Sequence, residues 1–433
     1  MDSYKGKKVL VAGLGKSGTA AKEALISLGA EVFVRDDNRG YFPAPENKYD
    51  MLVLSPGVPP DLEYIQRAAA EGSEIIGELE LFYRLSKGSI IAVTGTNGKT
   101  TTTALIGEIF KNAGKDTYVV GNIGTAATSV FSVTRDESWL ITEASSFQLE
   151  TIKDFRPCIS VILNITPDHL DRHKNMRNYI EAKANVFKNQ REDDYFVVNY
   201  DNDNAYGLTP ECKAKIVPFS CVTELPFGVF VKDGVIVCRD ENRELTGICE
   251  AGRLFIPGGH NLENALAATA AAYFAGIPVH VIAETLSTFK GVPHRLELCG
   301  EIRGVSFIND SKATNPDAAI KAITAVEKPI ILIAGGYDKK SEFDEFIGSF
   351  GDKVKMMVLL GDTAKDIKEA AEKKGFRNCV IVSDMEECVR TAFESAVWGD
   401  AVLLSPACAS WDMYDSFEER GEQFKNCVLK LGS

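Results

Sequence analysis

The sequence lacks the features that would place it in several specialised classes. Its ten cysteines are scattered singly, with no C-x-x-C pair and no Cys/His cluster at zinc spacing, so we expect free thiols in a reducing compartment. No apolar run approaches the roughly 18 residues of a membrane span. The first residues, MDSYKGKKVLVAGLG, show no apolar signal core, so a cytoplasmic location is expected. Low-complexity tracts and short repeats are also missing.

Positive charge is in short supply. The chain has 48 Lys and Arg against 61 Asp and Glu, a formal net charge of −13. A nucleic-acid binder needs a basic face to neutralise phosphates, so nucleic acid is not an expected partner. Anionic small molecules remain possible ligands where local donors are suitable. The length of 433 residues and the 45% hydrophobic content are typical of two or three globular domains.

Three segments alternate short β-branched runs with helical patterns, which is typical of open, largely parallel α/β sheets. Residues 1–88 contain KKVLVAG, EVFVRDD and DMLVLSPG, and EIIGELEL continues the alternation. Residues 89–290 start with SIIAVTG and include short strands near 213–257. Residues 291–433 contain PIILIAGG, KVKMMVLLG, NCVIVSD and AVLLSPA. We predict an α/β protein of three domains in series: a Rossmann-like N-terminal domain, a central P-loop ATPase-type domain with a small β-annex, and a Rossmann-like C-terminal domain.

The first glycine-rich loop, GLGKSG, spans Gly13 to Gly18 at a strand-to-helix turn. It matches G-x-G-x-x-G, in which glycines let the backbone approach a diphosphate at a helix N-terminus. Asp36 and Asp37 end the next strand, where a carboxylate can accept hydrogen bonds from ribose hydroxyls. Taken alone, the motif leaves open a nicotinamide or flavin, another nucleotide, or a tight turn that binds nothing.

The second loop, GTNGKTT, has a lysine between a glycine and a hydroxyl residue, as in a phosphate loop. Backbone amides and Lys99 suit the β- and γ-phosphates, and Thr100 can ligate Mg²⁺. The loop is a variant, because Val93 stands where the full motif has its first glycine. Oxygen ligands for the metal are expected at strand ends, from Glu143 after WLIT or from Asp168 with His169 in NITPDHLDRH.

Together, these motifs resemble those of the Mur ligases of peptidoglycan synthesis. The segments that carry the resemblance are GTNGKTTT, EASSFQLE, NITPDHLDRH, GGHNLENALAA, VPHRLE, NDSKATNP and SPACASWDMYDSFEERGEQF, which span nearly the whole chain in the family's order. SSFQLE and the closing segment resemble the D-glutamate-adding branch. The resemblance implies an ATP-dependent ligase whose substrates are UDP-N-acetylmuramoyl-L-alanine and D-glutamate, with the first loop holding the uridine diphosphate and the second holding ATP.

The resemblance also implies roles for individual residues. Lys99 would grip the phosphates, Thr100 and Glu143 would hold one Mg²⁺, and His169 would serve a second. Lys183, a surface lysine by its helical pattern alone, matches a position that such families carry as a carbamylated (N6-carboxylated) lysine. Further ATP contacts are implied for Gly95, Thr96, Asn97, Gly98, Thr101, Asn261, Asn264, Arg295 and Asp310. The UDP-linked substrate would contact Lys16, Ser17, Asp36, Asp37, Asn122 and Ser145, and the reacting groups and D-glutamate would contact Lys312, Thr314, Lys339, Ser410 and Phe417.

Other interpretations remain open at this stage. Lys340 is an alternative to Lys339, and a monomer is expected. A sibling ligase would add L-alanine or a diamino acid, although the extra acidic motif of a diamino-acid site is not seen. Folylpolyglutamate synthase shares the phosphate loop but usually lacks the N-terminal diphosphate domain. A nicotinamide-dependent dehydrogenase would leave GTNGKTT without a role, and a non-catalytic nucleotide-binding regulator would not need Glu143, His169 and Lys183.

Overall fold

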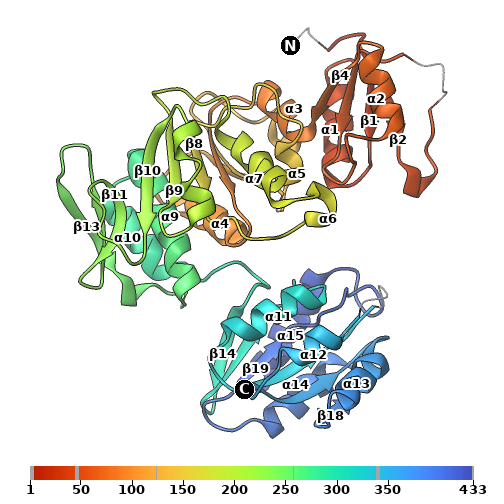
Figure 1. Cartoon of the computed structure of the whole chain (residues 1–433). Coiled ribbons are helices and arrows are strands. Elements are labelled where there is room, and N and C mark those ends of the chain that lie inside the picture. Colours follow the sequence, from red (N-terminus) through yellow and green to blue (C-terminus); the bar gives the residue numbers. More distant parts are fainter. Residues whose placement is uncertain (1–3, 44–47, 123, 257, 338–341, 432–433) are drawn as a thin grey trace. The chain divides into compact units, whose positions relative to one another are not determined.

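The computed structural model describes residues 4–43, 48–122, 124–256, 258–337 and 342–431. The chain divides into two compact units, Met1–Phe289 and Lys290–Ser433 (Figure 1). Unit 1 contains two β-sheets and unit 2 contains one. The predicted α/β class is confirmed. The boundaries of the three predicted domains stay a prediction, because the first two sheets share one unit.

A four-stranded parallel sheet of order β2-β1-β3-β4 opens unit 1. Its elements are β1 (Lys8–Ala12), α1 (Lys16–Ser27), β2 (Glu31–Arg35), β3 (Met51–Leu54), α2 (Glu63–Ala70), β4 (Glu74–Gly77) and α3 (Glu78–Leu85). Val9 and Val11 pack with residues of α1 and α3, whereas Leu10 and Ala12 pack with residues of α2. Helices therefore cover both faces, which explains the continuous apolar run of β1. The segment EIIGELEL is divided at Gly77, where β4 ends and α3 begins.

The second sheet of unit 1 has nine strands in the order β13-β12-β11-β10-β9-β8-β5-β7-β6. The strands are β5 (Ser89–Thr94), β6 (Thr117–Gly121), β7 (Trp139–Glu143), β8 (Ile159–Ile162), β9 (Tyr195–Asn199), β10 (Lys215–Ser220), β11 (Gly228–Lys232), β12 (Val235–Arg239) and β13 (Leu245–Glu250). The helices are α4 (Lys99–Asn112), α5 (Ser146–Leu149), α6 (Leu170–His173), α7 (Met176–Ala184), α8 (Asp203–Tyr206), α9 (Gly259–Phe274) and α10 (Val279–Thr288). The predicted β-annex corresponds to β10–β13, which extend the central sheet because β10 pairs in parallel with β9.

Unit 2 is built on a six-stranded sheet of order β14-β15-β19-β16-β17-β18, in which only the β14–β15 pair is antiparallel. Its strands are β14 (Glu297–Ile302), β15 (Val305–Asn309), β16 (Ile330–Ala334), β17 (Val354–Leu359), β18 (Cys379–Ile381) and β19 (Ala401–Leu404). Its helices are α11 (Pro316–Ala325), α12 (Asp344–Gly348), α13 (Ala364–Lys373), α14 (Met385–Ser395) and α15 (Phe417–Leu431). The strands predicted at PIILIAGG, KVKMMVLLG, NCVIVSD and AVLLSPA are confirmed.

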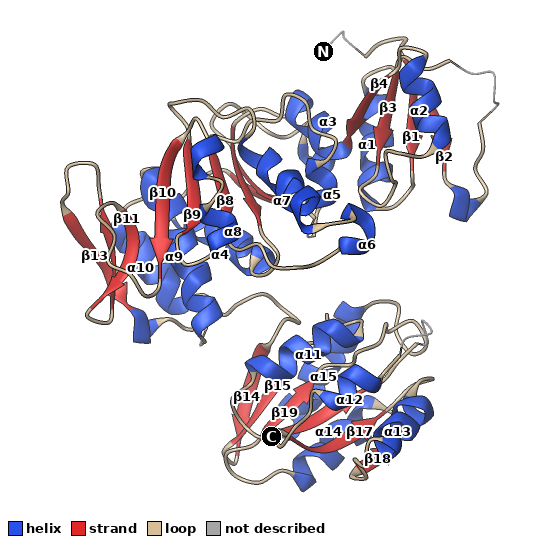
Figure 2. Ribbon diagram, in the orientation of Figure 1, coloured by secondary structure: helices blue, strands red, loops and turns tan. Residues whose placement is uncertain are grey.

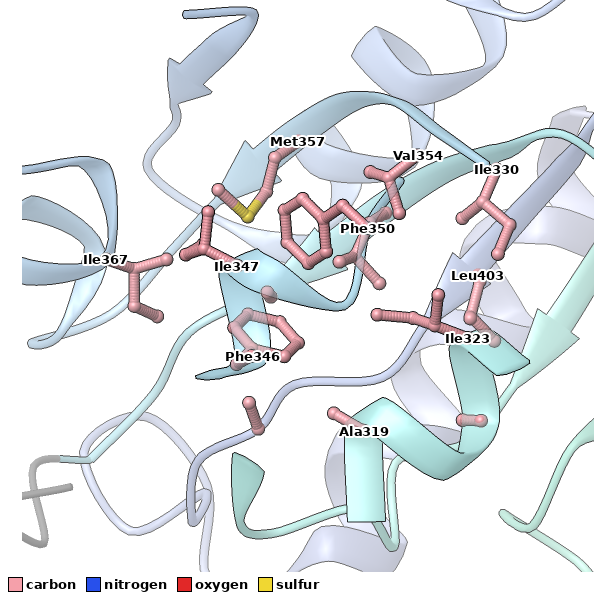
Figure 3. Close-up of a cluster of buried hydrophobic side chains, with 14 of the residues drawn as sticks. Ala319, Ile323, Ile330, Phe346, Ile347, Phe350, Val354, Met357, Ile367 and Leu403 are labelled. Atoms are coloured by element: carbon pink, nitrogen blue, oxygen red, sulfur yellow. The ribbon is translucent and has the colours of Figure 1, made fainter. Parts of the chain in front are cut away.

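Helices lie on both faces of this sheet (Figure 2). On one face, Ile330 and Leu403 join Ile323 of α11 and Phe346 and Ile347 of α12 in a buried cluster (Figure 3). On the other face, Ile331 and Ile333 pack with residues of α14 and α15. Alternate strand residues thus enter different cores, and the strands are apolar throughout because both of their faces are buried.

The strand order of unit 2 determines where a ligand can bind. The chain runs from β15 through α11 to β16, and β19 later inserts between these two strands. In open α/β sheets, ligands bind beyond the carboxyl ends of strands at such a switch point. The loops that follow β15, β16 and β19 meet there.

None of the helices in the described part of the chain is long and apolar enough to cross a membrane.

Glu80 joins the helix α3 to the central sheet of unit 1. Its side chain is fully buried, and its carboxylate accepts hydrogen bonds from the backbone N–H groups of Lys153 (2.8 Å), Asp154 (3.0 Å) and Phe155 (3.0 Å). Arg84 Nε donates a further bond of 2.8 Å. One carboxylate therefore satisfies three backbone donors of a segment more than 70 residues away, which pins the helix to that segment.

We predict that Glu80→Ala lowers the free energy of unfolding by about 3 kcal/mol, because it leaves one buried and two part-buried backbone donors, and Arg84, without their acceptor. Chemical denaturation of the purified variant measures this change. Glu71→Ala, at an exposed carboxylate after α2, is the control and should shift the free energy by less than about 0.5 kcal/mol. Equal stabilities for the two variants would contradict the assigned role.

Candidate active site

The first glycine loop connects β1 to α1, and its glycines serve different purposes. Gly13 has a φ of 83°, and Ser55 Oγ donates a hydrogen bond to its carbonyl oxygen. A Cβ on Gly18 would lie 1.8 Å from that same oxygen, so Gly18 is required by the packing of helix on strand. Gly15 has open space around it and precedes α1 without a side-chain cap. The first N–H groups of α1 are therefore available to an anion that approaches Gly15.

The acidic residues after β2 are partly committed to the loop itself. Asp36 accepts hydrogen bonds from the backbone N–H groups of Leu14 (2.7 Å) and Arg39 (3.1 Å). Asp37 is exposed and forms an ion pair with Arg35 at 3.0 Å. Lys16 is exposed and Ser17 half-buried on the first turn of α1. The predicted substrate residues of this region thus lie around one loop, with Asp36 holding its shape.

The second glycine loop connects β5 to α4. Gly98 has a φ of 83° and precedes α4 without a side-chain cap, and a Cβ there would lie 2.3 Å from Asn264 Oδ1. The Asn97 backbone N–H donates to Asn164 Oδ1 at 2.9 Å. Uncapped N–H groups at the start of a 14-residue helix attract phosphate. Thr101 lies half-buried on this first turn.

Thr100, Glu143 and Asn122 form a polar contact beside the loop. Glu143 is the last residue of β7, as predicted, and its side chain is buried. Its Oε2 accepts a hydrogen bond of 2.9 Å from Thr100 Oγ1, and its Oε1 accepts one of 2.8 Å from Asn122 Nδ2. A hydroxyl and a carboxylate in contact at the start of a phosphate loop are the hard oxygen ligands that Mg²⁺ prefers.

Lys99 and Lys183 donate to the same carbonyl oxygen. Lys99 Nζ lies 2.9 Å and Lys183 Nζ 2.7 Å from the oxygen of Gly95. Lys183 is 1% exposed, so the surface position suggested by its helical pattern is wrong. Burial, and then the charge of Lys99, lower the pKa of Lys183 well below its ordinary value. The neutral amine of Lys183 is therefore favoured in this position.

The remaining predicted residues of the central region lie nearby. Thr96 is buried, and its Oγ1 is 3.1 Å from the hydroxyl of Tyr179. His169 is half-exposed with a φ of 53°, and its ring lies 5.0 Å from that of Phe147. Ser145 caps α5 in a capping box with Gln148. Among the described residues, no group of three His, Cys, Asp or Glu side chains could hold a metal alone.

The start of α9 packs against the phosphate loop. Asn264 is buried, its Oδ1 accepts a hydrogen bond from Thr102 Oγ1 at 3.1 Å, and its Nδ2 donates to Asn261 Oδ1 at 3.2 Å. Both predicted asparagines are therefore next to the loop that would hold the nucleotide phosphates.

Unit 2 brings together the predicted amino-acid residues that the structure describes. Lys312 Nζ lies 5.7 Å from the ring centroid of Phe417, and the Ser311 hydroxyl donates to Phe417 O at 2.8 Å. Thr314 is half-buried two residues further along, and Ser410 is buried in the loop after β19. Lys339 and its alternative Lys340 lie outside the described residues.

Asp310 and Arg295, predicted ATP contacts, also belong to unit 2. Asp310 is buried, accepts hydrogen bonds from Ser405 Oγ (2.9 Å) and the Leu296 N–H (3.3 Å), and has a pKa that burial raises to about 7. Arg295 is exposed. Asp310 therefore fixes the Arg295–Leu296 turn in addition to any contact with a ligand.

Sequence reasoning missed three residues that shape these sites. Asn164 orients the phosphate loop through Asn97, and Tyr179 joins Thr96 to Lys183, whose Nζ lies 4.6 Å from the Tyr179 ring centroid. Arg420 is buried behind the loops of unit 2. All three lie in or near motifs that were recognised, but their roles depend on contacts between segments far apart in the sequence.

These features define a class of α/β enzymes. In this class, one strand-to-helix loop suits a diphosphate and a second suits a nucleoside triphosphate. Comparison with known families makes the assignment specific. Residues 93–272 match the Mur ligase middle domain, and residues 294–408 match the Mur ligase, glutamate ligase domain. The chain belongs to the Mur ligase family.

Similar proteins cover the whole chain. The UDP-N-acetylmuramoylalanine–D-glutamate ligase of Thermoanaerobacter sp. (strain X514) is 50% identical over 99% of both chains, and that of Clostridioides difficile (strain 630) is 48% identical over 99% of both. Among solved structures, MurC from Thermotoga maritima is 20% identical with a TM-score of 0.59, covering 98% of this chain and 100% of its own. MurF from the same organism, in complex with ADP, is 16% identical with a TM-score of 0.57 over 100% of this chain and 98% of its own. These likenesses confirm the fold.

We predict opposite outcomes for two substitutions in the first loop. Gly18→Ala lowers the free energy of unfolding by about 3 kcal/mol, because its Cβ has no room. Gly15→Ala changes stability by less than about 1 kcal/mol but weakens the binding of UDP, because its Cβ stands where the diphosphate would approach the backbone. Chemical denaturation and calorimetric titration with UDP measure the two effects. Similar destabilisation by both variants would refute this division of roles.

Proposed function

We propose that the chain is an ATP-dependent ligase that joins D-glutamate to UDP-N-acetylmuramoyl-L-alanine. The observation that carries the proposal is full-length identity of about half the residues with ligases of that name, in a chain whose phosphate loop, Glu143 and Lys183 are assembled in one place. A carboxylate does not condense with an amine in neutral water because it is a poor electrophile. Phosphoryl transfer from ATP converts the substrate carboxylate into an acyl phosphate, which has a good leaving group.

The amide bond then forms in two steps. The neutral amine of D-glutamate attacks the acyl carbon and gives a tetrahedral intermediate. The carbon–oxygen bond to phosphate breaks, inorganic phosphate leaves, and the amine loses a proton. Charge accumulates on phosphoryl oxygens during the first transfer, so cationic groups that are already in position contribute most to the rate.

The second loop fits the phosphates of ATP. Its uncapped N–H groups and Lys99 supply donors, and the space around Gly98 is closed by Asn264. Thr100 and Glu143 would hold one magnesium ion and His169 would serve a second. A bound magnesium ion neutralises charge on the phosphates and needs few protein ligands, since phosphate and water oxygens complete its shell. The absence of a three-residue cluster among the described residues is compatible with this arrangement.

Lys183 is suited to carboxylation by carbon dioxide. The reaction requires a neutral amine: the nitrogen attacks the carbon of CO₂, a proton leaves, and an anionic carbamate forms. Burial beside Lys99 favours the neutral amine, and a carbamate at this position would be attracted to the positive charge of Lys99. The carbamate oxygen is also a hard ligand of the kind that Mg²⁺ prefers.

The other substrates are assigned to the remaining loops. The uridine diphosphate would lie at Gly15, Lys16 and Ser17, so the first loop implies no hydride carrier. D-Glutamate would lie among Lys312, Thr314, Ser410 and Phe417 of unit 2. We also propose a cytoplasmic monomer.

Phosphate release from ATP tests this function directly. With UDP-N-acetylmuramoyl-L-alanine present, we expect release with D-glutamate and none above background with L-alanine or a diamino acid. Release with a different amino acid would indicate a sibling ligase and overturn the assignment of Thr314, Ser410 and Phe417. Release with none of the three would refute the ligase assignment.

We predict that Lys183→Ala lowers kcat by about 100-fold or more, and that a short-chain carboxylic acid partly restores it by supplying the missing anion. Lys188→Ala, at an exposed lysine five residues away, is the control and should retain full activity without rescue. Loss of activity that no carboxylic acid restores, together with an unmodified mass for Lys183 in the active wild-type protein, would contradict the carbamate.

A further inference from the structure

Arg420 in α15 is the largest fully buried side chain among the described residues, at 1% exposure. Within the described part of the chain, every acceptor of its guanidinium is a neutral oxygen. Nε donates to Ser311 Oγ at 3.0 Å, Nη1 to Ala409 O at 3.1 Å, and Nη2 to Ser311 O at 2.9 Å and Cys408 O at 3.1 Å. Four of its five N–H donors are accounted for in this way.

No ion pair among the described residues includes Arg420, and the negative charge of Asp412 acts on it only from beyond ion-pair distance. Burial lowers the pKa of Arg420 to about 10, so the side chain still carries its charge at neutral pH. Burying a charge that lacks an opposite charge is costly, and buried ions in proteins are normally paired. Hydrogen bonds to neutral oxygens hold the guanidinium in place, but they do not supply a paired negative charge.

The oxygens that Arg420 contacts belong to two loops at the switch point of the sheet. Ser311 follows β15 and immediately precedes Lys312, and Cys408 and Ala409 follow β19 and immediately precede Ser410. The Ser311 hydroxyl also donates to Phe417 O, one turn before Arg420 on α15. One side chain thus connects the three segments that carry Lys312, Thr314, Ser410 and Phe417.

The loop after β19 has a conformation that needs such support. Ala407 has a φ of 59°, a region that residues other than glycine rarely adopt. Beside it, a Cβ on Gly336 would lie 2.2 Å from Ala409 O and 3.1 Å from Arg420 Nη1. The carbonyl groups of Cys408 and Ala409 are thereby turned toward the guanidinium, and Ser410 is placed by the same turn.

We propose that Arg420 is the positioning residue of the amino-acid site. It holds Ser311 and the Cys408–Ala409 turn in place, and its positive charge, which no ion pair neutralises, attracts the carboxylate of the incoming amino acid. The inference rests on the proposed function. It identifies Arg420 as a residue that favours an acidic amino acid as the acceptor. In a site of low dielectric constant, one unpaired cation attracts a nearby carboxylate more strongly than the same charge does in water. Arg420 does not need to touch the substrate to act in this way.

Arg420→Met tests the inference by comparing two nucleophiles in the full-length enzyme. Hydroxylamine is small and neutral, and its nitrogen attacks the acyl phosphate carbon to give a hydroxamate and inorganic phosphate without using an amino-acid site. We expect the KM for D-glutamate to rise about tenfold, because the variant loses both the attraction of the buried charge and the support of the two loops. Hydroxamate formation with ATP and UDP-N-acetylmuramoyl-L-alanine, and the KM for ATP, should stay within about twofold of wild type, since D-glutamate is not a reactant in acyl phosphate formation.

A structural role alone would give a different pattern. Equal loss of hydroxamate and D-glutamate product would overturn the inference, and so would an unchanged KM for D-glutamate. Arg390→Met, at an exposed arginine of α14, is the matched control and should behave as wild type. If the wild-type enzyme forms neither hydroxamate nor D-glutamate product, the proposed function itself is wrong.

Two milder variants decide the matter if Arg420→Met does not fold. Arg420→Lys keeps the charge but loses the planar fork, so we expect its KM for D-glutamate to be raised several-fold. Ser311→Ala keeps Arg420 and removes the hydroxyl that links Arg420 to Phe417, and it should also raise this KM while leaving hydroxamate formation intact. Normal KM values in both variants would overturn the inference.

Discussion

Parallel strand pairing is the constraint on which the rest of this structure depends. Neighbouring parallel strands end at the same edge of their sheet, so residues that follow them meet even when the sequence separates them widely. β5 lies between β7 and β8 in the central sheet, which brings Thr100, Glu143 and Asn164 to one phosphate loop. β19 lies between β15 and β16 in unit 2, which brings Ser311 and Ser410 to one edge.

Buried charges occur at both of these edges and are accommodated in different ways. Lys183 can lose its proton, and burial beside Lys99 favours that loss. Arg420 keeps its proton and is surrounded by carbonyl oxygens. An amine can react with carbon dioxide once it is neutral, whereas a guanidinium remains a cation and acts through its charge and its fork of donors. The same cost of burial is therefore reduced by loss of a proton in one site and by hydrogen bonds to neutral oxygens in the other.

Local patterns predicted the features that depend on neighbouring residues in the chain. The strands of unit 2, the helix at GHNLENALAATAAAYF and the position of Glu143 at a strand end all follow from periodicity and turn residues. Contacts between distant segments were not predictable in this way. The residues near 213–257 alternate between apolar and polar side chains, and this pattern would be the same in a separate sheet and in an extension of the central sheet. Only the pairing of β10 with β9 shows that these strands extend the central sheet.

The sequence by itself determined the α/β class, both glycine-rich loops and the family, because these depend on glycine conformation and on short-range order. The tertiary structure alone decided which glycine is needed for packing and which leaves room for a ligand, since Gly18 faces Gly13 O and Gly15 faces open space. It also decided that Lys183 and Arg420 are buried. Burial depends on which other segments pack against a side chain, and helical or strand periodicity carries no information about those partners.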